Sequence, residues 1–359
     1  MSFVERAYRL HRRIINPNER GVLLGVCRAV LWPPAALYSL AVRLRNAAYD
    51  RGWKTVHRAA APVISVGNIT AGGTGKTPFV AWLCERLTAK DTRPAILSRG
   101  YGADEESGVD DENQMLQKLA PGTPVIVDPD RVAGAERAIT DHDADVLVMD
   151  DGFQHRRLHR DFDLVLIDAL LPFGGGHTLP RGLLREPAGS LRRADAVVIT
   201  RADQVGEEEL LALQERVRAH AGPVPLACAD HVPTGLSPVG EGPAPEIEAL
   251  REGTWGAFCG LGNPDGFRRT LRDLGAELDF FRVFPDHHVY TREEVETLQR
   301  RGLELRCRGL LTTEKDAIKL RSLPKLPIAL PMHALQVRME VGQGEQQLWR
   351  GICAAIESN

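Results

Sequence analysis

Residues 66–78 read VGNITAGGTGKTP, and the residue types in this run suit the binding of phosphate. Glycines let consecutive backbone N–H groups turn toward phosphate oxygens, and a helix beginning at Lys76 adds the partial positive charge of its N-terminus. The lysine would reach the β- and γ-phosphates of a nucleotide, and the Thr77 hydroxyl would bind Mg²⁺. We therefore predict a nucleotide-binding loop made of Thr70, Gly72, Gly73, Thr74, Gly75, Lys76 and Thr77.

One position departs from the usual phosphate-loop pattern G-x-x-x-x-G-K-[ST]. Its first glycine would fall at position 70, where this chain has Thr70. This position lies at the entrance of the loop, whereas Gly72, Gly73 and Gly75 lie nearer the phosphates. We expect the loop to tolerate the change.

Two carboxylates follow a second apolar run. Val146–Met149 leads directly into Asp150 and Asp151. An acid after a buried strand can lie near Mg²⁺ in phosphoryl-transfer enzymes, although two adjacent acids could also cap a turn. Together with the phosphate loop, the pattern favours a metal site formed by Thr77, Asp150 and Asp151.

Downstream segments carry candidates for the acceptor side of a reaction. Residues 150–161, DDGFQHRRLHRD, are rich in His and Arg. Contact with an anionic substrate would explain this composition, and a solvated surface is the alternative. His287 follows Asp286 in FPDHH and is a candidate general base, because an imidazole with a pKa near 6.5 can accept a proton at cellular pH.

Three classes of nucleotide-using protein fit a phosphate loop. The partitioning ATPases, which act as membrane-associated switches, would have a signature lysine at position 71, where this chain has Ala71. A GTPase would have an N-K-x-D motif, and the nearest candidate, Thr200-Arg201-Ala202-Asp203, lacks the asparagine. A kinase needs an acceptor site and a base, which the His- and Arg-rich segments could supply. A membrane-recruited NTPase switch without an acceptor is the alternative.

The elements that must position these residues follow an α/β rhythm. Short apolar runs alternate with helix-length segments after residue 60, which predicts a mostly parallel sheet covered on both faces. Pro-rich residues 224–248 read as a linker, and a second α/β rhythm follows. We predict three parts: a basic N-terminal arm over 1–60, a phosphate-loop domain over 61–230 and a smaller α/β domain, with the linker, over 231–359.

The N-terminal arm combines basic and apolar residues. Eleven Arg or Lys residues lie among the first 60 against three acids, although the whole chain has a net charge of −3. Ala29–Val42 lacks charge but is only 14 residues long, and Pro33-Pro34 would break a helix there. This pattern favours a segment lying in the headgroup layer of a membrane, with packing on the protein body as the alternative. No groove-reading motif accompanies the basic residues, so we expect no nucleic-acid partner.

Several segments in order resemble the lipid A 4′-kinases, or tetraacyldisaccharide 4′-kinases, of Gram-negative bacteria. They are spread in order over residues 64–320 and read ISVGNITAGGTGKTPF, LSRGYG, DDGFQHRRLHRD, LPRGLLREP, RRADAVVITRAD, GLGNPDGF, FPDHH and TTEKDAIKL. The resemblance implies a P-loop NTPase-like fold and transfer of the γ-phosphoryl group of ATP, with Mg²⁺, to the 4′-hydroxyl of a tetraacyl glucosamine disaccharide 1-phosphate, forming lipid IVA. It also implies a peripheral protein at the cytoplasmic face of the inner membrane, which it contacts through the arm.

The resemblance further implies roles for individual residues. An Asp–His pair would act on the acceptor hydroxyl; the His falls on His287, and the Asp on Asp111, with Asp110 as the fallback because the family's G-D-E-P motif is altered to V-D-D-E-N here. Lys76 would bind phosphate and take part in catalysis. Further positions would line the nucleotide cleft, namely Gln154, His155, Arg185 and Glu186, and, as weaker matches, Arg99, Tyr101 and Arg131.

Overall fold

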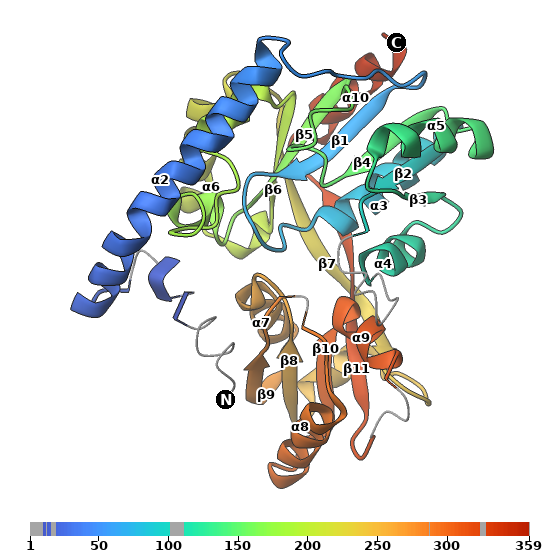
Figure 1. Cartoon of the computed structure of the whole chain (residues 1–359). Coiled ribbons are helices and arrows are strands. Elements are labelled where there is room, and N and C mark those ends of the chain that lie inside the picture. The colour runs from blue at the N-terminus through green and yellow to red at the C-terminus, as the bar shows by residue number, and fades with distance from the viewer. Residues whose placement is uncertain are drawn as a thin grey trace. The chain divides into compact units, whose positions relative to one another are not determined.

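The computed structural model describes residues 10–11, 13–15, 19–100, 111–286, 288–323 and 328–358, and of residues 111 and 112 it describes the backbone alone. The chain divides into two units, shown in Figure 1. Unit 1 comprises residues 1–99, 120–230 and 340–359, and unit 2 comprises residues 100–119 and 231–339. Two segments therefore group differently from the predicted domains: residues 100–119 belong to unit 2, and the C-terminal residues 340–359 belong to unit 1.

Unit 1 contains a parallel sheet whose central strands are fully buried. Its strand order is β3-β2-β4-β1-β5-β6-β7, and every pair from β3 through β7 for which the register is defined runs parallel. The strands are β1 (Val63–Asn68), β2 (Pro94–Ser98), β3 (Val125–Val127), β4 (Val146–Asp150), β5 (Phe162–Asp168), β6 (Ala196–Thr200) and the first part of β7 (Leu226–Pro238). The apolar runs of the sequence are these strands.

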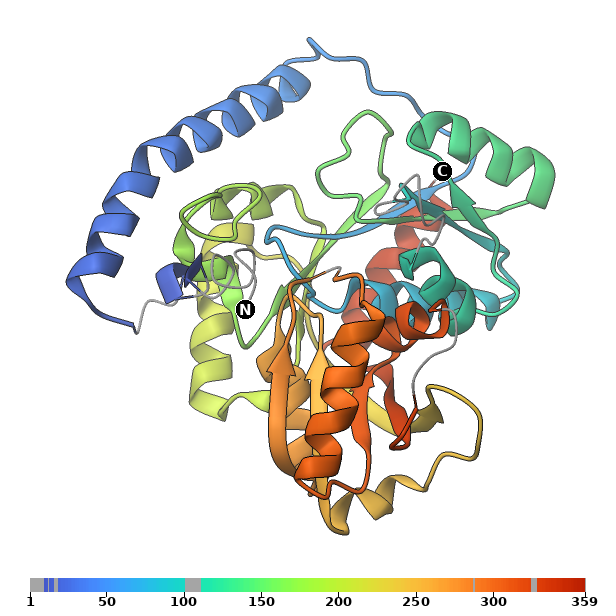
Figure 2. The same ribbon diagram turned by 60° about the horizontal axis from the view of Figure 1, so that its bottom comes forward.

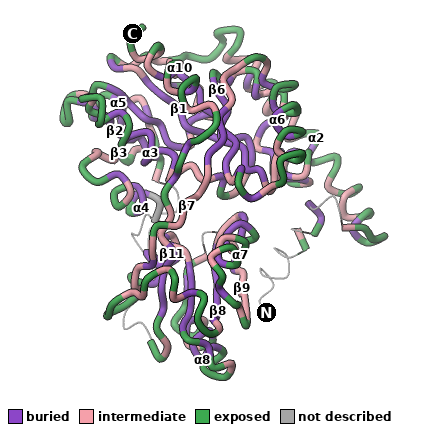
Figure 3. Tube along the Cα trace, turned by 180° about the vertical axis from the view of Figure 1, so that it is seen from behind, coloured by how far each residue is buried: buried purple, intermediate pink, exposed green. Residues whose placement is uncertain are grey.

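Helices cover both faces of this sheet. Val63, Leu147 and Val165 share one face by register, and that face packs on α5 (Arg131–His142) and α6 (Glu207–Ala221). Phe162 points to the other face, where it contacts Gly351 of α10 (Glu345–Glu357). Figure 3 shows the buried strands between more exposed helices. The predicted fold class is confirmed.

Unit 2 has its own strands and core, although the strands of both units are numbered in one 11-stranded sheet. Its strand order is β11-β10-β8-β9, and the pairs with a defined register are parallel. Its apolar residues form two clusters, one around Phe258 and Tyr290 and the other around Trp255 and Leu271. The elements are α4 (Asp111–Leu119), β8 (Thr254–Cys259), α7 (Pro264–Asp273), β9 (Glu277–Val283), α8 (Arg292–Glu304), β10 (Leu310–Thr313), α9 (Glu314–Arg321) and the first part of β11 (Met332–Val341).

Within the predicted linker over residues 224–248, residues 226–238 form a long strand, β7. Two strands, β7 and β11, run from one unit into the other (Figure 1). Cys228 exchanges backbone hydrogen bonds with residues 342 and 343 in unit 1, and Val239 donates to Met332 in unit 2. Prolines inside a paired strand would remove hydrogen bonds of the sheet. Pro233 and Pro238 remove none from the pairing with β6, because they lie beyond residues 226–229, which form that pairing.

Residues Val22–Asp50 form a single 29-residue helix, α2, so the predicted break at Pro33-Pro34 is wrong. Figure 2 shows this helix as one gently curved rod. A proline inside a helix removes a hydrogen bond to the carbonyl four residues earlier. Here those carbonyls belong to Ala29 and Val30, both exposed, so water can satisfy them. By length and composition α2 would be sufficient to cross a membrane, and 11% of its most apolar window is buried.

Candidate functional site

The phosphate loop connects the central strand of unit 1 to a helix. Strand β1 ends at Asn68, and α3 (Lys76–Thr88) begins at the predicted lysine. Gly72 and Gly75 have φ values of 113° and 85°, which favour glycine. The loop therefore turns at the carboxyl end of a buried parallel strand, the edge at which such sheets bind ligands.

Thr70 can replace the first glycine because its backbone is not in the left-handed region, where a side chain is disfavoured. It forms an antiparallel bridge with Leu184. Backbone hydrogen bonds on either side complete the contact: Ala71 donates to the carbonyl of Leu183, and Arg185 donates to that of Ile69. The L-P-R-G-L-L-R-E-P segment is thus joined to the entrance of the loop.

Polar side chains from distant parts of the chain hold the loop in place. Asn68 donates to the Thr74 hydroxyl at 3.0 Å, and the Thr200 hydroxyl donates to the Thr74 carbonyl at 2.9 Å. Arg201 donates to the Gly73 carbonyl at 3.2 Å while pairing with Asp168 at 2.6 Å. Sequence reasoning missed these roles. The only signal was the T-R-A-D run after β6, which differs from the GTPase motif N-K-x-D. Its Thr200 and Arg201 hydrogen-bond to the phosphate loop.

Lys76 and Arg185 meet at one carboxylate. The Lys76 Nζ lies 3.4 Å from Asp151 Oδ1, and Arg185 Nη1 donates to Asp151 Oδ2 at 2.6 Å. Burial by itself would raise the pKa of Asp151, but the charges of Lys76 and Arg185 outweigh it and lower that pKa to about 2. Asp151 is therefore an anion at neutral pH, with a cation on each side.

Asp150 ends strand β4 and is buried, with 5% of its surface exposed. Asp151, the next residue, has a φ of 52° and turns the chain out of the sheet. Together with Thr77 at the start of α3, the two acids supply two carboxylates and a hydroxyl. Mg²⁺ is commonly held by one or two carboxylates together with substrate phosphates, so this donor set fits Mg²⁺ bound with a nucleotide. Among the described residues no cluster of three or more His, Cys, Asp or Glu could hold a metal by itself.

Gln154 and His155 lie beside the phosphate loop. A Cβ at Gly67 would lie 2.6 Å from the Cβ of Phe153, so the glycine in β1 permits the 151–155 turn to approach. Gln154 then donates to the Asn68 carbonyl at 2.8 Å. Burial, followed by the charges of nearby arginines, lowers the pKa of His155 to about 4, so this imidazole is neutral at pH 7. The arginines are Arg131, Arg99, Arg160 and Arg45.

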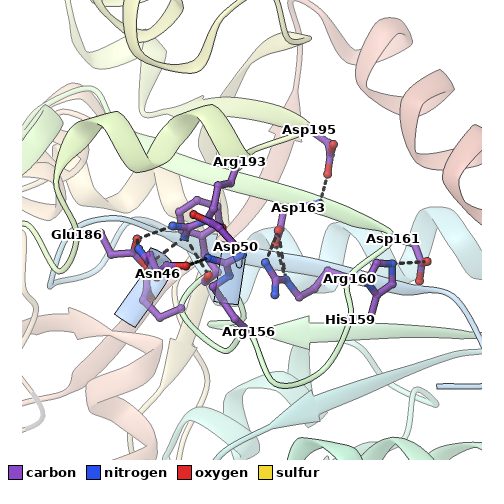
Figure 4. A network of polar contacts seen from close by, with 12 residues as sticks. Asn46, Asp50, Arg156, His159, Arg160, Asp161, Asp163, Glu186, Arg193 and Asp195 are labelled. Carbon is purple, nitrogen blue, oxygen red and sulfur yellow. Dashed lines mark hydrogen bonds and ion pairs between the residues drawn. The ribbon is translucent and has the colours of Figure 1, made fainter. Parts of the chain in front are cut away.

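Glu186 is almost completely buried, and Figure 4 shows Asn46 and Arg193 beside it. Asn46 of α2 donates to its carboxylate at 2.7 Å, and Arg193 donates to it at 2.8 Å. Tyr38 of α2 donates to the Arg185 carbonyl, and Arg45 donates to the Gln154 carbonyl. Helix α2 is therefore hydrogen-bonded to three residues predicted to line the nucleotide cleft, a connection that sequence reasoning missed.

The remaining predicted residues are placed as follows. Asp111 is the first residue of α4, but its side chain lies outside what the structure describes. Asp110, Tyr101 and His287 lie outside the described residues. Arg131 is the first residue of α5 and is buried, and Arg99 is exposed just after β2.

Known proteins resemble this chain along nearly its whole length. The model of a family described as tetraacyldisaccharide-1-P 4'-kinase matches residues 27–357. A tetraacyldisaccharide 4'-kinase of Anaeromyxobacter sp. (strain K) is 41% identical over 95% of this chain and 93% of its own. One of Geobacter sulfurreducens is 39% identical over 91% of this chain and 94% of its own. The crystal structure of LpxK from Aquifex aeolicus in complex with ATP matches 92% of this chain and 99% of its own, with 30% identity and a TM-score of 0.67.

Proposed function

The chain belongs to the tetraacyldisaccharide-1-P 4'-kinase family, and we propose that it transfers the γ-phosphoryl group of ATP to the 4′-hydroxyl of tetraacyl glucosamine disaccharide 1-phosphate, forming lipid IVA. The phosphate loop at the carboxyl edge of the sheet is the observation that carries this proposal. Lys76 lies at the N-terminus of the helix that follows the loop, and Asp150 ends the neighbouring strand β4. The family model matches this chain over residues 27–357.

The nucleotide side of the reaction rests on charge. Phosphoryl transfer requires positioning and neutralisation of negative charge more than covalent chemistry. Lys76 and Arg185 are two cations that share one anion, Asp151. The phosphates of ATP offer these cations a second set of anionic partners, so Lys76 can bind the transferred group while Arg185 keeps Asp151 in place.

Thr77 and Asp150 are the residues we assign to Mg²⁺, with Asp151 next to them. The ion, bound with ATP, would neutralise charge on the phosphate oxygens. The residues' own contribution is position: Thr77 is fixed by the first turn of α3, and Asp150 by the end of buried strand β4.

The acceptor side is assigned to unit 2. Asp111, at the start of α4, would orient His287, and His287 would take the proton of the 4′-hydroxyl. Asp111 and His287 both belong to unit 2, whereas Lys76 belongs to unit 1. The reaction thus draws its nucleotide site and its base from different units.

We assign membrane contact to α2. Six of its exposed apolar residues recur at helical spacing and share one face, namely Leu23, Val26, Val30, Leu37, Leu40 and Leu44, whereas the exposed Trp32 lies off this face. Tyr38, Arg45 and Asn46 lie outside this face and bind the rest of unit 1 as described above. A helix fixed along one face to unit 1 would lie on a membrane and not cross it. A four-chain glycolipid does not leave the bilayer readily, and this placement brings the site to its substrate at the cytoplasmic face of the inner membrane.

The experiment that tests this function uses γ-labelled ATP and Mg²⁺ with two acceptors in detergent micelles: tetraacyldisaccharide 1-phosphate and the same lipid without its 4′-hydroxyl. We expect label in the first lipid and none in the second. Release of label only as free phosphate, at the same rate with either lipid, would instead support an NTPase switch.

A further inference from the structure

The T-T-E-K-D segment at the end of β10 has no part in the function described so far. Thr313 caps α9 by accepting from the Asp316 N–H. The next three residues, Glu314, Lys315 and Asp316, begin α9, and each of their side chains contacts a different segment of unit 2.

Asp316 holds the glycine-rich turn after β8. Its two carboxylate oxygens each accept from the Gly260 N–H at 3.1 Å, and it also accepts from the Tyr290 hydroxyl at 2.9 Å. A Cβ at Gly260 would lie 3.0 Å from Asp316 and 3.1 Å from the carbonyl of Pro285, so the turn approaches as closely as a glycine allows. Asp316 is fully buried.

Lys315 holds the segment that contains the predicted base. Its Nζ lies 3.3 Å from the carboxylate of Asp286, the residue before His287 in the chain. His288, the residue after His287, stacks on Phe284 with ring centroids 4.7 Å apart and pairs with Glu294 at 2.9 Å. Tyr290, which Asp316 binds, packs edge-on against both of these rings.

Glu314 holds the helix that begins at the predicted aspartate. Its carboxylate is buried and pairs with Lys118 in the last turn of α4. Helix α4 is nine residues long and starts at Asp111, and it packs on α9 in unit 2. The buried Glu314 carboxylate holds Lys118 near one end of this short helix and so limits the position of the other end, about 10 Å away.

We infer that Glu314, Lys315 and Asp316 are positioning residues for phosphoryl transfer, which set the placement of Asp111 and of the residues flanking His287. The inference rests on the proposed function. One rigid helix turn holds both segments that carry the acceptor-side pair, so a change in it displaces the pair without altering the nucleotide site in unit 1. Displacement of a reacting group by about 1 Å can reduce a rate by about 100-fold.

The test measures kcat, the KM for ATP and direct ATP binding for Lys315→Met, Glu314→Gln and Tyr290→Phe in the full-length enzyme with its lipid acceptor. Tyr290→Phe removes one hydroxyl and keeps the ring, so it serves if Asp316 itself cannot be replaced without unfolding. We expect kcat to fall at least tenfold for Lys315→Met and Glu314→Gln and by a smaller factor for Tyr290→Phe. The affinity of all three variants for ATP should stay within about twofold of the native value. Lys315→Arg should recover activity relative to Lys315→Met.

The matched control is Arg292→Gln, which breaks an exposed ion pair with Glu296 in the same unit. It should leave kcat unchanged. Native kcat in Lys315→Met and Glu314→Gln, or a loss of ATP binding that equals the loss of kcat, would overturn the inference. Failure of the native enzyme to label the lipid would contradict the proposed function instead, so the two failures are distinguishable.

Discussion

Asp151 lies between two cations, and its protonation state follows from them. Lys76 and Arg185 approach opposite oxygens of its carboxylate. The folded protein therefore keeps the charged form to a lower pH than the unfolded chain does. Any group of this kind stabilises the fold above its unfolded pKa and ceases to do so as the pH falls through its folded value.

The acid stability of the protein should depend on Asp151. Its pKa falls from 3.8 to about 2, so its contribution is fully present above pH 4 and is lost between about pH 4 and pH 2. A shift of this size corresponds to about 2 kcal/mol. Urea unfolding of the native protein and of Asp151→Asn between pH 7 and pH 2 measures it. The difference between the two should shrink toward the acid end, and a constant difference would contradict this assignment.

His155 gives a second test of the same sign, in a different pH range. Its folded pKa is lowered to about 4, so the folded state resists a proton that the unfolded state accepts below about pH 6.5. Stability contributed by the neutral imidazole is present above pH 6.5 and decreases as the pH falls to 4. Replacing His155 by Gln should make the free energy of unfolding less dependent on pH in this window. An unchanged pH dependence would show that burial and the surrounding arginines do not lower the pKa of this ring.

At the scale of elements, α2 is attached to unit 1 through buried polar contacts. The pair Arg193–Glu186, with Asn46 as the third member, joins the helix to the segment that contacts the phosphate loop (Figure 4). Tyr38 of the same helix donates to the Arg185 carbonyl, so the position of Arg185 depends on that of α2.

Breaking that attachment should be costly. Arg193→Met would leave the buried Glu186 carboxylate without its cationic partner, and loss of one partner of a buried ion pair costs about 3–5 kcal/mol. The double change Glu186→Gln with Arg193→Met should recover part of this loss, since it removes the buried charge. Urea unfolding measures both. The control Arg292→Met breaks an exposed pair and should cost under about 1 kcal/mol.

The exposed face of α2 should determine membrane binding. Leu37, Leu40 and Leu44 are more than half exposed. Replacing all three by Ser should reduce partition onto vesicles of anionic phospholipid at least tenfold, because burying each leucine contributes roughly 1.5–3 kcal/mol. Vesicle flotation measures it, with Leu211→Ser and Leu303→Ser as controls, since these leucines are exposed on other helices. An equal loss of vesicle binding in the controls would show that binding does not depend on the exposed face of α2.

At the scale of the whole molecule, the sequence predicts what lies close together in the chain. Asp150 follows an apolar run directly, and Lys76 and Thr77 follow another after a short glycine-rich loop, so the strands and the phosphate loop could be located from local patterns. Arg201 contacts Gly73 across 128 positions and Asn46 contacts Glu186 across 140, and no local pattern encodes such pairs. The grouping of residues 340–359 with unit 1 likewise depends on the pairing of β11 with β7, which the prolines of that region concealed.

The two units also divide the predicted chemistry. The nucleotide-binding residues belong to unit 1, and the acceptor-side pair belongs to unit 2. Changes in the two units should therefore separate binding of ATP from transfer to the lipid. This separation distinguishes a lipid kinase from an NTPase without an acceptor, which would need no such pair.

The most direct measurement compares Lys76→Ala with His287→Ala in the labelled-ATP assay, alongside direct binding of ATP. We predict that Lys76→Ala weakens ATP binding and abolishes label in the lipid. We predict that His287→Ala binds ATP within about twofold of the native chain and transfers label at least 100-fold more slowly, within the range that general base catalysis supplies. Native transfer by His287→Ala would contradict the account, as would label released only as phosphate at a rate that the lipid does not change.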